Sequence, residues 1–93
     1  MTEDFYKYQA HTTPHPLALE ISHAEGSYIY DTSGKKHLDF VAGVSACTLG
    51  HCHPRVVAAI KNQVEKYLHV MVYGEYIQEA AVELAKLLSE NLP

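Results

Sequence analysis

Positive charge is scarce in this sequence. Eleven Asp and Glu residues outnumber seven Lys and Arg residues, and the formal net charge at pH 7 is -4. Nucleic-acid-binding surfaces need clustered basic side chains, whereas the only adjacent basic pair here is Lys35-Lys36, beside an expected turn. The composition therefore predicts no nucleic-acid partner.

Long apolar runs are also missing. A membrane-spanning helix needs about 20 consecutive apolar residues, and no segment approaches that length. Glu3 and Asp4 lie where a signal peptide would carry basic residues, and no apolar segment follows them. These features predict a cytoplasmic protein with no membrane partner.

Cysteine is rare and tryptophan is absent. Two cysteines, Cys47 and Cys52, cannot form the disulfide framework of a small secreted domain, so we expect both thiols to be reduced. The hydrophobic content of 47% and the charged content of 19% are typical of a globular chain. Ninety-three residues suffice for one small domain.

The first half of the chain predicts a short helix followed by three strands. We expect the helix at 4–10, an extended segment at 11–16 because of its two prolines, and strands at 17–21, 27–30 and 36–41. Alternating or β-branched and aromatic residues favour the strands. Asp31 and Gly34 bound a hairpin loop. The prediction is a three-stranded antiparallel meander.

The second half predicts two helices, which makes the fold class α+β. Pro54 suits a first helical position, and apolar residues at helical spacing extend this helix to about residue 67. Gly74 interrupts the pattern and Glu75 favours a new helix start. Pro93 follows this second helix. Because Pro after a helix commonly introduces another segment, the chain is either the opening part of a longer protein or a complete small domain.

Between the third strand and the first long helix lies a run of small residues, from Val44 to Thr48. A backbone without bulky side chains can approach another group closely, so this stretch is a candidate pocket wall. Two other chemistries are possible here. Cys47, His51 and His53 suggest zinc, but their spacing lacks a second ligand pair. Cys47 or Cys52 beside a His suggests a thiolate nucleophile, but nothing orients a base, which favours turn chemistry and helix capping by His53.

Several short motifs follow one another along the chain. They are Gly26-Ser27-Tyr28-Ile29-Tyr30-Asp31, Gly34-Lys35-Lys36, Leu38-Asp39-Phe40, Gly43-Val44 and Leu49-Gly50-His51-Cys52-His53-Pro54-Arg55-Val56. In this order they resemble the N-terminal region of class-III aminotransferases, pyridoxal-phosphate enzymes of fold type I. Within this family the chain resembles the acetylornithine and ornithine aminotransferases, and the resemblance covers nearly the whole chain from about Pro16.

The resemblance implies an organisation and an activity. Residues 1–16 would form an N-terminal arm, residues 17–53 the meander and pocket loop of the small domain, and residues 54–93 two helices leading into the large domain. The whole protein would be a homodimer that transfers an amino group from an ω-amino or acetylated diamino acid, such as an acetylornithine-like substrate, to a 2-oxo acid. The pyridoxal phosphate would be held downstream. No catalytic or cofactor-binding residue is therefore expected in this segment, which alone should be inactive.

The resemblance also assigns residues. The substrate-facing loop matches Val44, Ser45, Ala46 and Cys47, and the structural motif around it matches Gly43, Gly50, His51, His53 and Pro54. Ornithine aminotransferases carry Tyr where Val44 stands, whereas acetylornithine-type enzymes carry an aliphatic residue.

A different interpretation needs no catalysis. The second helix has a broad apolar stripe, and Tyr73 and Tyr76 flank Gly74 in the preceding loop. Aromatic residues in such loops often serve interfaces. The chain could thus be a free-standing α+β module that dimerises through these residues.

Overall fold

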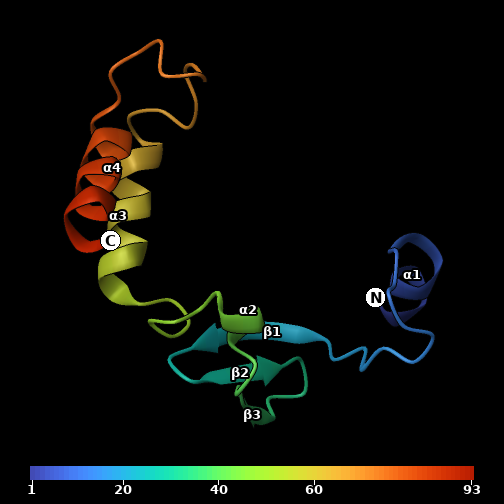
Figure 1. The fold of residues 1–93 in the computed structure, drawn as a ribbon. Coiled ribbons are helices and arrows are strands. Elements are labelled where there is room, and N and C mark those ends of the chain that lie inside the picture. The colour runs from blue at the N-terminus through green and yellow to red at the C-terminus, as the bar shows by residue number, and fades with distance from the viewer. The chain divides into compact units, whose positions relative to one another are not determined.

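The computed structural model describes all 93 residues and confirms the α+β class, with a three-stranded antiparallel sheet that helices precede and follow along the chain (Figure 1). The elements are α1 (Thr2–Tyr8), β1 (Ile21–Glu25), β2 (Tyr28–Asp31), β3 (Lys36–Leu38), α2 (Ala42–Ser45), α3 (Pro54–Val64) and α4 (Glu79–Asn91). Two compact units divide the chain, Met1–Lys61 and Asn62–Pro93. No helix is both long and apolar enough to cross a membrane.

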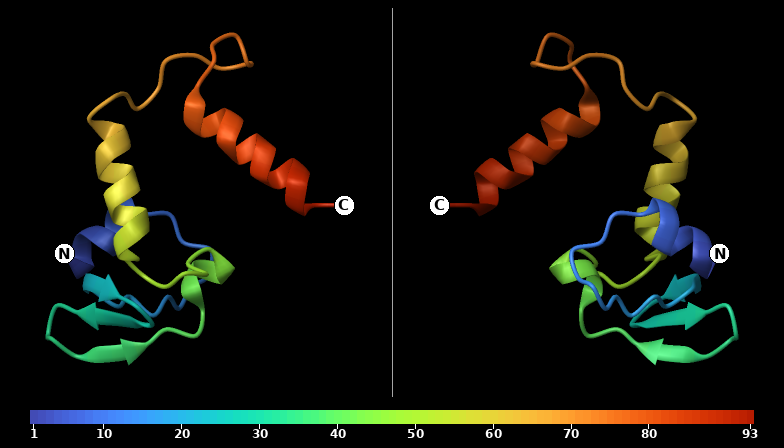
Figure 2. Two further views of the ribbon diagram at one scale, coloured as in Figure 1. Left: turned by 90° about the vertical axis from the view of Figure 1, so that its left-hand side faces the viewer. Right: turned by 90° about the vertical axis from the view of Figure 1, so that its right-hand side faces the viewer.

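The sheet is the predicted meander, with strand order β1-β2-β3. Glu25 pairs with Tyr28 across a two-residue connection that begins at Gly26, whose φ of +57° suits such a tight turn. In the next pair, Ile29 lies opposite His37. Figure 2 shows both turns and the loop that leads from β3 to α3.

The predicted first strand was wrong in its position. It was expected at 17–21, but β1 occupies Ile21–Glu25. The tight turn at Gly26 requires the strand to continue to Glu25. Ala18 has a φ of +48°, which is incompatible with an extended strand at that point.

Other boundaries also differ. The third strand ends at Leu38 instead of Val41 because Asp39 bonds the next backbone amides and starts a turn. The first helix begins at Thr2 and ends at Tyr8 instead of running from 4 to 10. Helix α3 begins at Pro54 as predicted and ends at Val64. Helix α4 begins at Glu79, after residue Gln78 at its N-cap, and not at Glu75.

No residue of this chain is buried as a whole. Phe40 is 90% exposed and Ile77 is 95% exposed. Cross-strand contacts stand in for a core in the sheet: the rings of His23 and Tyr30 stack at 4.4 Å, and the Lys36 ammonium lies 3.7 Å from the centre of the Tyr28 ring. The fold is thus a set of local elements whose apolar faces are exposed.

Candidate functional site

Residues 39–53, here called the pocket loop, connect β3 to α3. They contain α2 (Ala42–Ser45), which is a single left-handed turn and not a right-handed helix. The φ angles of Ala42, Gly43, Val44 and Ser45 are +50°, +61°, +58° and +65°. Left-handed backbone costs an L-residue about 1–2 kcal/mol, and it is rarest for a β-branched residue such as Val44. Three of the four, Ala42, Val44 and Ser45, carry this cost, whereas Gly43 does not, so the turn requires strong local restraint.

Backbone hydrogen bonds supply part of that restraint. The Ser45 N–H donates to the Val41 carbonyl at 3.1 Å, and the Cys47 N–H donates to the Ala42 carbonyl at 2.9 Å. The Ala46 N–H also donates to Ala42. The turn is consequently closed on itself by its own backbone.

The Asp39–His51 pair supplies the rest. Asp39 Oδ1 accepts hydrogen bonds from the Val41 and Ala42 amides, at 3.0 and 2.9 Å, immediately before the turn. His51 Nε2 lies 2.6 Å from Asp39 Oδ2. The bond from His51, with the Ala42 amide second, lowers the pKa of the Asp39 carboxyl, because both bonds favour the ionised form.

His51 is itself tied to the sheet. Its backbone exchanges two hydrogen bonds with Gly26, at 2.9 and 2.7 Å. Gly50, with a φ of +84°, approaches so closely that a Cβ there would lie 3.1 Å from the Gly26 carbonyl oxygen. The β1–β2 turn thereby anchors the far end of the pocket loop.

His53 and Pro54 start α3. The Arg55 amide donates to His53 Nδ1 at 3.2 Å, and the Val57 amide donates to the His53 carbonyl at 3.0 Å. The expected capping contact of His53 is therefore present. Pro54 lacks the N–H that a first helical position leaves unused.

The structure brings the predicted substrate-facing residues together. Val44, Ser45 and Ala46 lie exposed on the left-handed turn, and Cys47 follows half-buried. The exposed fraction of Val44 is 87%. Gly43 is packed on the same turn, since a Cβ there would lie 3.4 Å from Cys47 Sγ. Their role toward a substrate stays a prediction.

Asp39 was missed as a site residue. The sequence analysis placed it in a motif but gave it no role. An Asp side chain that accepts from the amides two and three residues later is a recognisable turn signal. Its partner His51, however, lies twelve residues away and is brought to Asp39 only by the tertiary fold. His51 itself was assigned only to the structural motif.

Metal chemistry finds no support in the geometry. His51 Nε2 faces Asp39, and His53 Nδ1 faces a backbone amide. No group of three or more His, Cys, Asp or Glu side chains is arranged to hold a metal ion. Cys47 and Cys52 are both free thiols.

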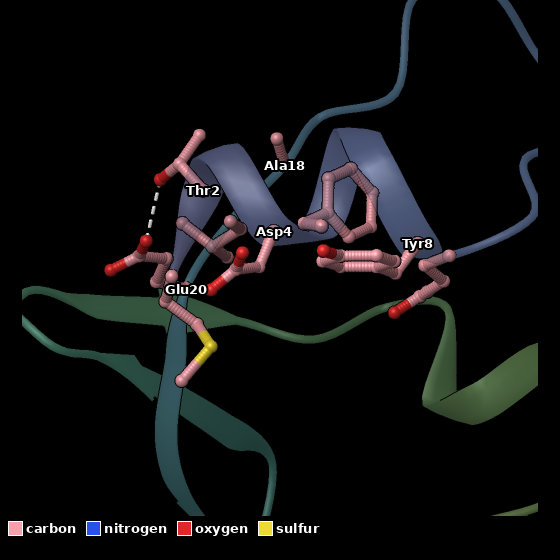
Figure 3. Close-up of a pocket in the computed structure, with 9 residues that line it drawn as sticks. Thr2, Asp4, Tyr8, Ala18 and Glu20 are labelled. Carbon is pink, nitrogen blue, oxygen red and sulfur yellow. Dashed lines mark hydrogen bonds between the residues drawn. The ribbon is translucent and has the colours of Figure 1, made fainter.

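A cavity of about 490 Å³ lies elsewhere, between α1 and residues 18–20. Figure 3 shows Asp4 and Tyr8 on the helix, Ala18 and Glu20 on the later segment, and the hydrogen bond that the Thr2 hydroxyl donates to Glu20, which is 2.5 Å long. This bond is the main cause that lowers the pKa of Glu20. A second cavity, of about 470 Å³, is lined by residues between Met71 and Ala85. Neither is lined by the pocket loop.

Known proteins are similar to this chain in both sequence and structure. The family model for aminotransferase class-III matches residues 8–93. An acetylornithine aminotransferase of Synechocystis sp. is 46% identical over 91 residues, which are 97% of this chain and 20% of the relative. Another, of Nostoc sp., is 53% identical over 55 residues, which are 59% of this chain and 12% of the relative.

Solved structures agree. An acetylornithine aminotransferase of Elizabethkingia anophelis is 32% identical with a TM-score of 0.77, over 95% of this chain and 22% of that one. An omega transaminase of Pseudomonas jessenii, in complex with PMP, is 28% identical with a TM-score of 0.85, over 100% of this chain and 22% of that one. The chain thus spans about a fifth of the length of these relatives.

Proposed function

This chain belongs to the class-III aminotransferase family, and from that premise we propose that it forms the N-terminal segment of an enzyme that transfers an amino group from an acetylornithine-like or other ω-amino acid to a 2-oxo acid. The observation that carries the proposal is the 46% identity to an acetylornithine aminotransferase across 97% of the chain, a span that includes the pocket loop. The relatives named for this substrate support an acetylated donor.

In this proposal the left-handed turn is one wall of the substrate pocket. Val44 extends from it with an aliphatic side chain, and Ser45 and Ala46 add little bulk. A substrate with an uncharged acetyl group needs room and an apolar surface, since burying its polar atoms without partners is unfavourable. Val44 offers that surface.

Pyridoxal phosphate is proposed as the cofactor of the whole protein. The pocket loop contains no lysine that could bind the group covalently, and the lysines with defined contacts lie on other elements. Lys36 lies over Tyr28, Lys7 lies 5.0 Å from the Tyr8 ring centre, and Lys86 lies 3.9 Å from Glu90. We therefore derive no catalytic step from this segment, and we expect it to be inactive alone.

The proposal also includes a cytoplasmic homodimer. Helix α4 presents Leu84 and Leu88, which are 58% and 47% exposed, and the chain's exposed apolar faces need further protein to cover them. The rest of the polypeptide and a second subunit are the partners that supply such cover in this interpretation.

The test uses the full-length protein. Its absorbance spectrum should show a bound pyridoxal cofactor, and steady-state assays should compare N-acetylornithine, ornithine and another ω-amino acid as donors to a 2-oxo acid. We expect the highest kcat/KM with the acetylated donor. A full-length protein that binds no cofactor and transfers no amino group would refute the proposal.

A further inference from the structure

Four consecutive left-handed residues are an unusual way to build a loop, and such backbone persists only where surrounding contacts over-determine it. In the pocket loop the turn Ala42–Ser45 follows directly on the two amides that Asp39 holds. We propose that the Asp39–His51 pair is a positioning device that holds this turn, and with it Val44, in place for substrate binding. The inference rests on the proposed function for what the turn contacts.

The path of restraint can be followed bond by bond. Backbone bonds of 2.9 and 2.7 Å fix His51 to Gly26 in the sheet. His51 Nε2 then lies 2.6 Å from Asp39 Oδ2, which orients the carboxylate. The other oxygen of the same carboxylate accepts from the Val41 and Ala42 amides. A single carboxylate, that of Asp39, thereby connects the turn to His51 and so to the β1–β2 hairpin.

The pair is shielded more than its surroundings. The side chains of His51 and Asp39 are 18% and 7% exposed, although no residue in the chain is buried overall. A hydrogen bond to an ionised group in such a setting is stronger than a neutral one. Without the imidazole the Asp39 carboxylate would be free to rotate toward solvent, and two amides would lose their acceptor.

The sheet contains a matched pair that serves as a control. His37 Nε2 lies 2.8 Å from Asp31 Oδ2, and Asp31 Oδ1 accepts from the Ser33 and Lys35 amides. The chemistry is the same, but these amides belong to the β2–β3 hairpin and not to the pocket loop. Losing His37 should affect local stability without moving Val44.

The experiment compares four variants of the full-length, cofactor-loaded protein: His51→Ala, His51→Gln, Asp39→Asn and His37→Ala. Amide hydrogen exchange by mass spectrometry reports on residues 40–47, and steady-state kinetics report KM and kcat for the amino donor. Asp39→Asn keeps the Oδ1 acceptor and replaces the oxygen that faces His51, so it provides a milder perturbation should His51→Ala fold poorly.

We expect His51→Ala to accelerate exchange across residues 40–47 and to lower kcat/KM about 10- to 100-fold, the effect of a misplaced binding group. Most of the loss should be in the donor KM, because the turn provides binding and not chemistry. Asp39→Asn should change the exchange rate and kcat/KM in the same directions as His51→Ala, but by a smaller amount. His51→Gln should recover both, since its amide can donate to Asp39, and His37→Ala should match wild type.

Other results would overturn the inference. Unchanged exchange over residues 40–47 in His51→Ala and Asp39→Asn would show that the pair does not hold the turn. Equal losses in His51→Ala and His37→Ala would show a general stability effect. A fall in kcat with an unchanged KM would place the effect outside donor binding. A wild-type enzyme without transaminase activity would instead refute the proposed function, and the exchange rates would then decide on the restraint alone.

Discussion

Gly50 and Gly34 adopt nearly the same backbone conformation in different surroundings. Their φ angles are +84° and +85°, but a Cβ on Gly50 would lie 3.1 Å from the Gly26 carbonyl oxygen, whereas a Cβ on Gly34 would meet nothing within 4 Å. Position 34 therefore favours glycine only because of its positive φ angle. Glycine at Gly50 also permits the close approach that joins the pocket loop to the sheet.

We predict that Gly50→Ala destabilises the full-length protein more than Gly34→Ala does. The left-handed conformation alone should cost Gly34→Ala about 1 kcal/mol, and the clash with rigid backbone should bring Gly50→Ala to roughly 2–4 kcal/mol. Urea unfolding of both variants and wild type measures the difference. Equal destabilisation would show that the contact with Gly26 is easily relaxed.

Val44 is the residue at which donor specificity should be adjustable. We predict that Val44→Tyr lowers kcat/KM for N-acetylornithine relative to ornithine by about 10-fold or more, a typical effect of a side chain that fills part of a pocket. The larger ring takes the space of the acetyl group, and its hydroxyl offers a partner to a free amine.

The control is Val44→Ile, which keeps an aliphatic, β-branched side chain and should change the ratio little. Competition between the two donors in one assay gives the ratio directly. A Tyr variant whose ratio equals that of the Ile variant would indicate that Val44 does not face the donor.

At the scale of elements, the carboxyl groups of Asp31 and Asp39 make the stability of the sheet and of the pocket loop depend on pH. The bond from the Ser33 hydroxyl, followed by that from His37, lowers the pKa of the Asp31 carboxyl well below its usual value of 3.8. The pKa of Asp39 is also lowered from 3.8, chiefly by His51. In both cases folding favours the ionised carboxylate.

The sign follows from this direction. A carboxyl whose pKa is lower in the folded state stabilises the fold fully above its usual pKa, and this contribution is lost as the pH falls through the lowered value. We predict that the urea midpoint of the full-length protein falls between about pH 4 and pH 2, and that the double variant Asp31→Asn, Asp39→Asn flattens the fall. Wild type and variant with the same slope in this range would contradict it.

At the scale of the whole molecule, the absence of any buried hydrophobic residue is the dominant fact. Phe40, Leu17 and Ile77 are each at least 90% exposed, so the chain alone removes little apolar surface from water. Burial of apolar surface is the main term that offsets the loss of conformational entropy on folding. The local elements are well formed, but nothing in the chain joins them into a core.

We predict that the isolated 93-residue chain unfolds without a cooperative transition, binds a hydrophobic dye and self-associates. The measurements are differential scanning calorimetry, dye fluorescence and sedimentation, with the full-length protein as control. A monodisperse species with a sharp calorimetric transition would contradict this and would favour the free-standing dimerisation module instead.

The sequence was sufficient where structure is encoded by neighbours. Pro54 predicted the start of α3, His53 its cap, and the turn signals at Asp31 and Gly34 the β2–β3 hairpin. Order and spacing of the motifs predicted the family. Each of these depends on contacts within a few residues or on a pattern preserved along the chain, which single-sequence reasoning can detect.

The tertiary structure decided what depends on distant pairs. The first strand shifted to Ile21–Glu25 because its register is set by β2 across Gly26. The left-handed turn at Ala42–Ser45, the Asp39–His51 pair and the contact of Gly50 with Gly26 were not predicted. Small residues could predict that the backbone approaches another group closely. Which group it approaches depends on how the chain returns to the β1–β2 hairpin, and only three-dimensional packing determines that path.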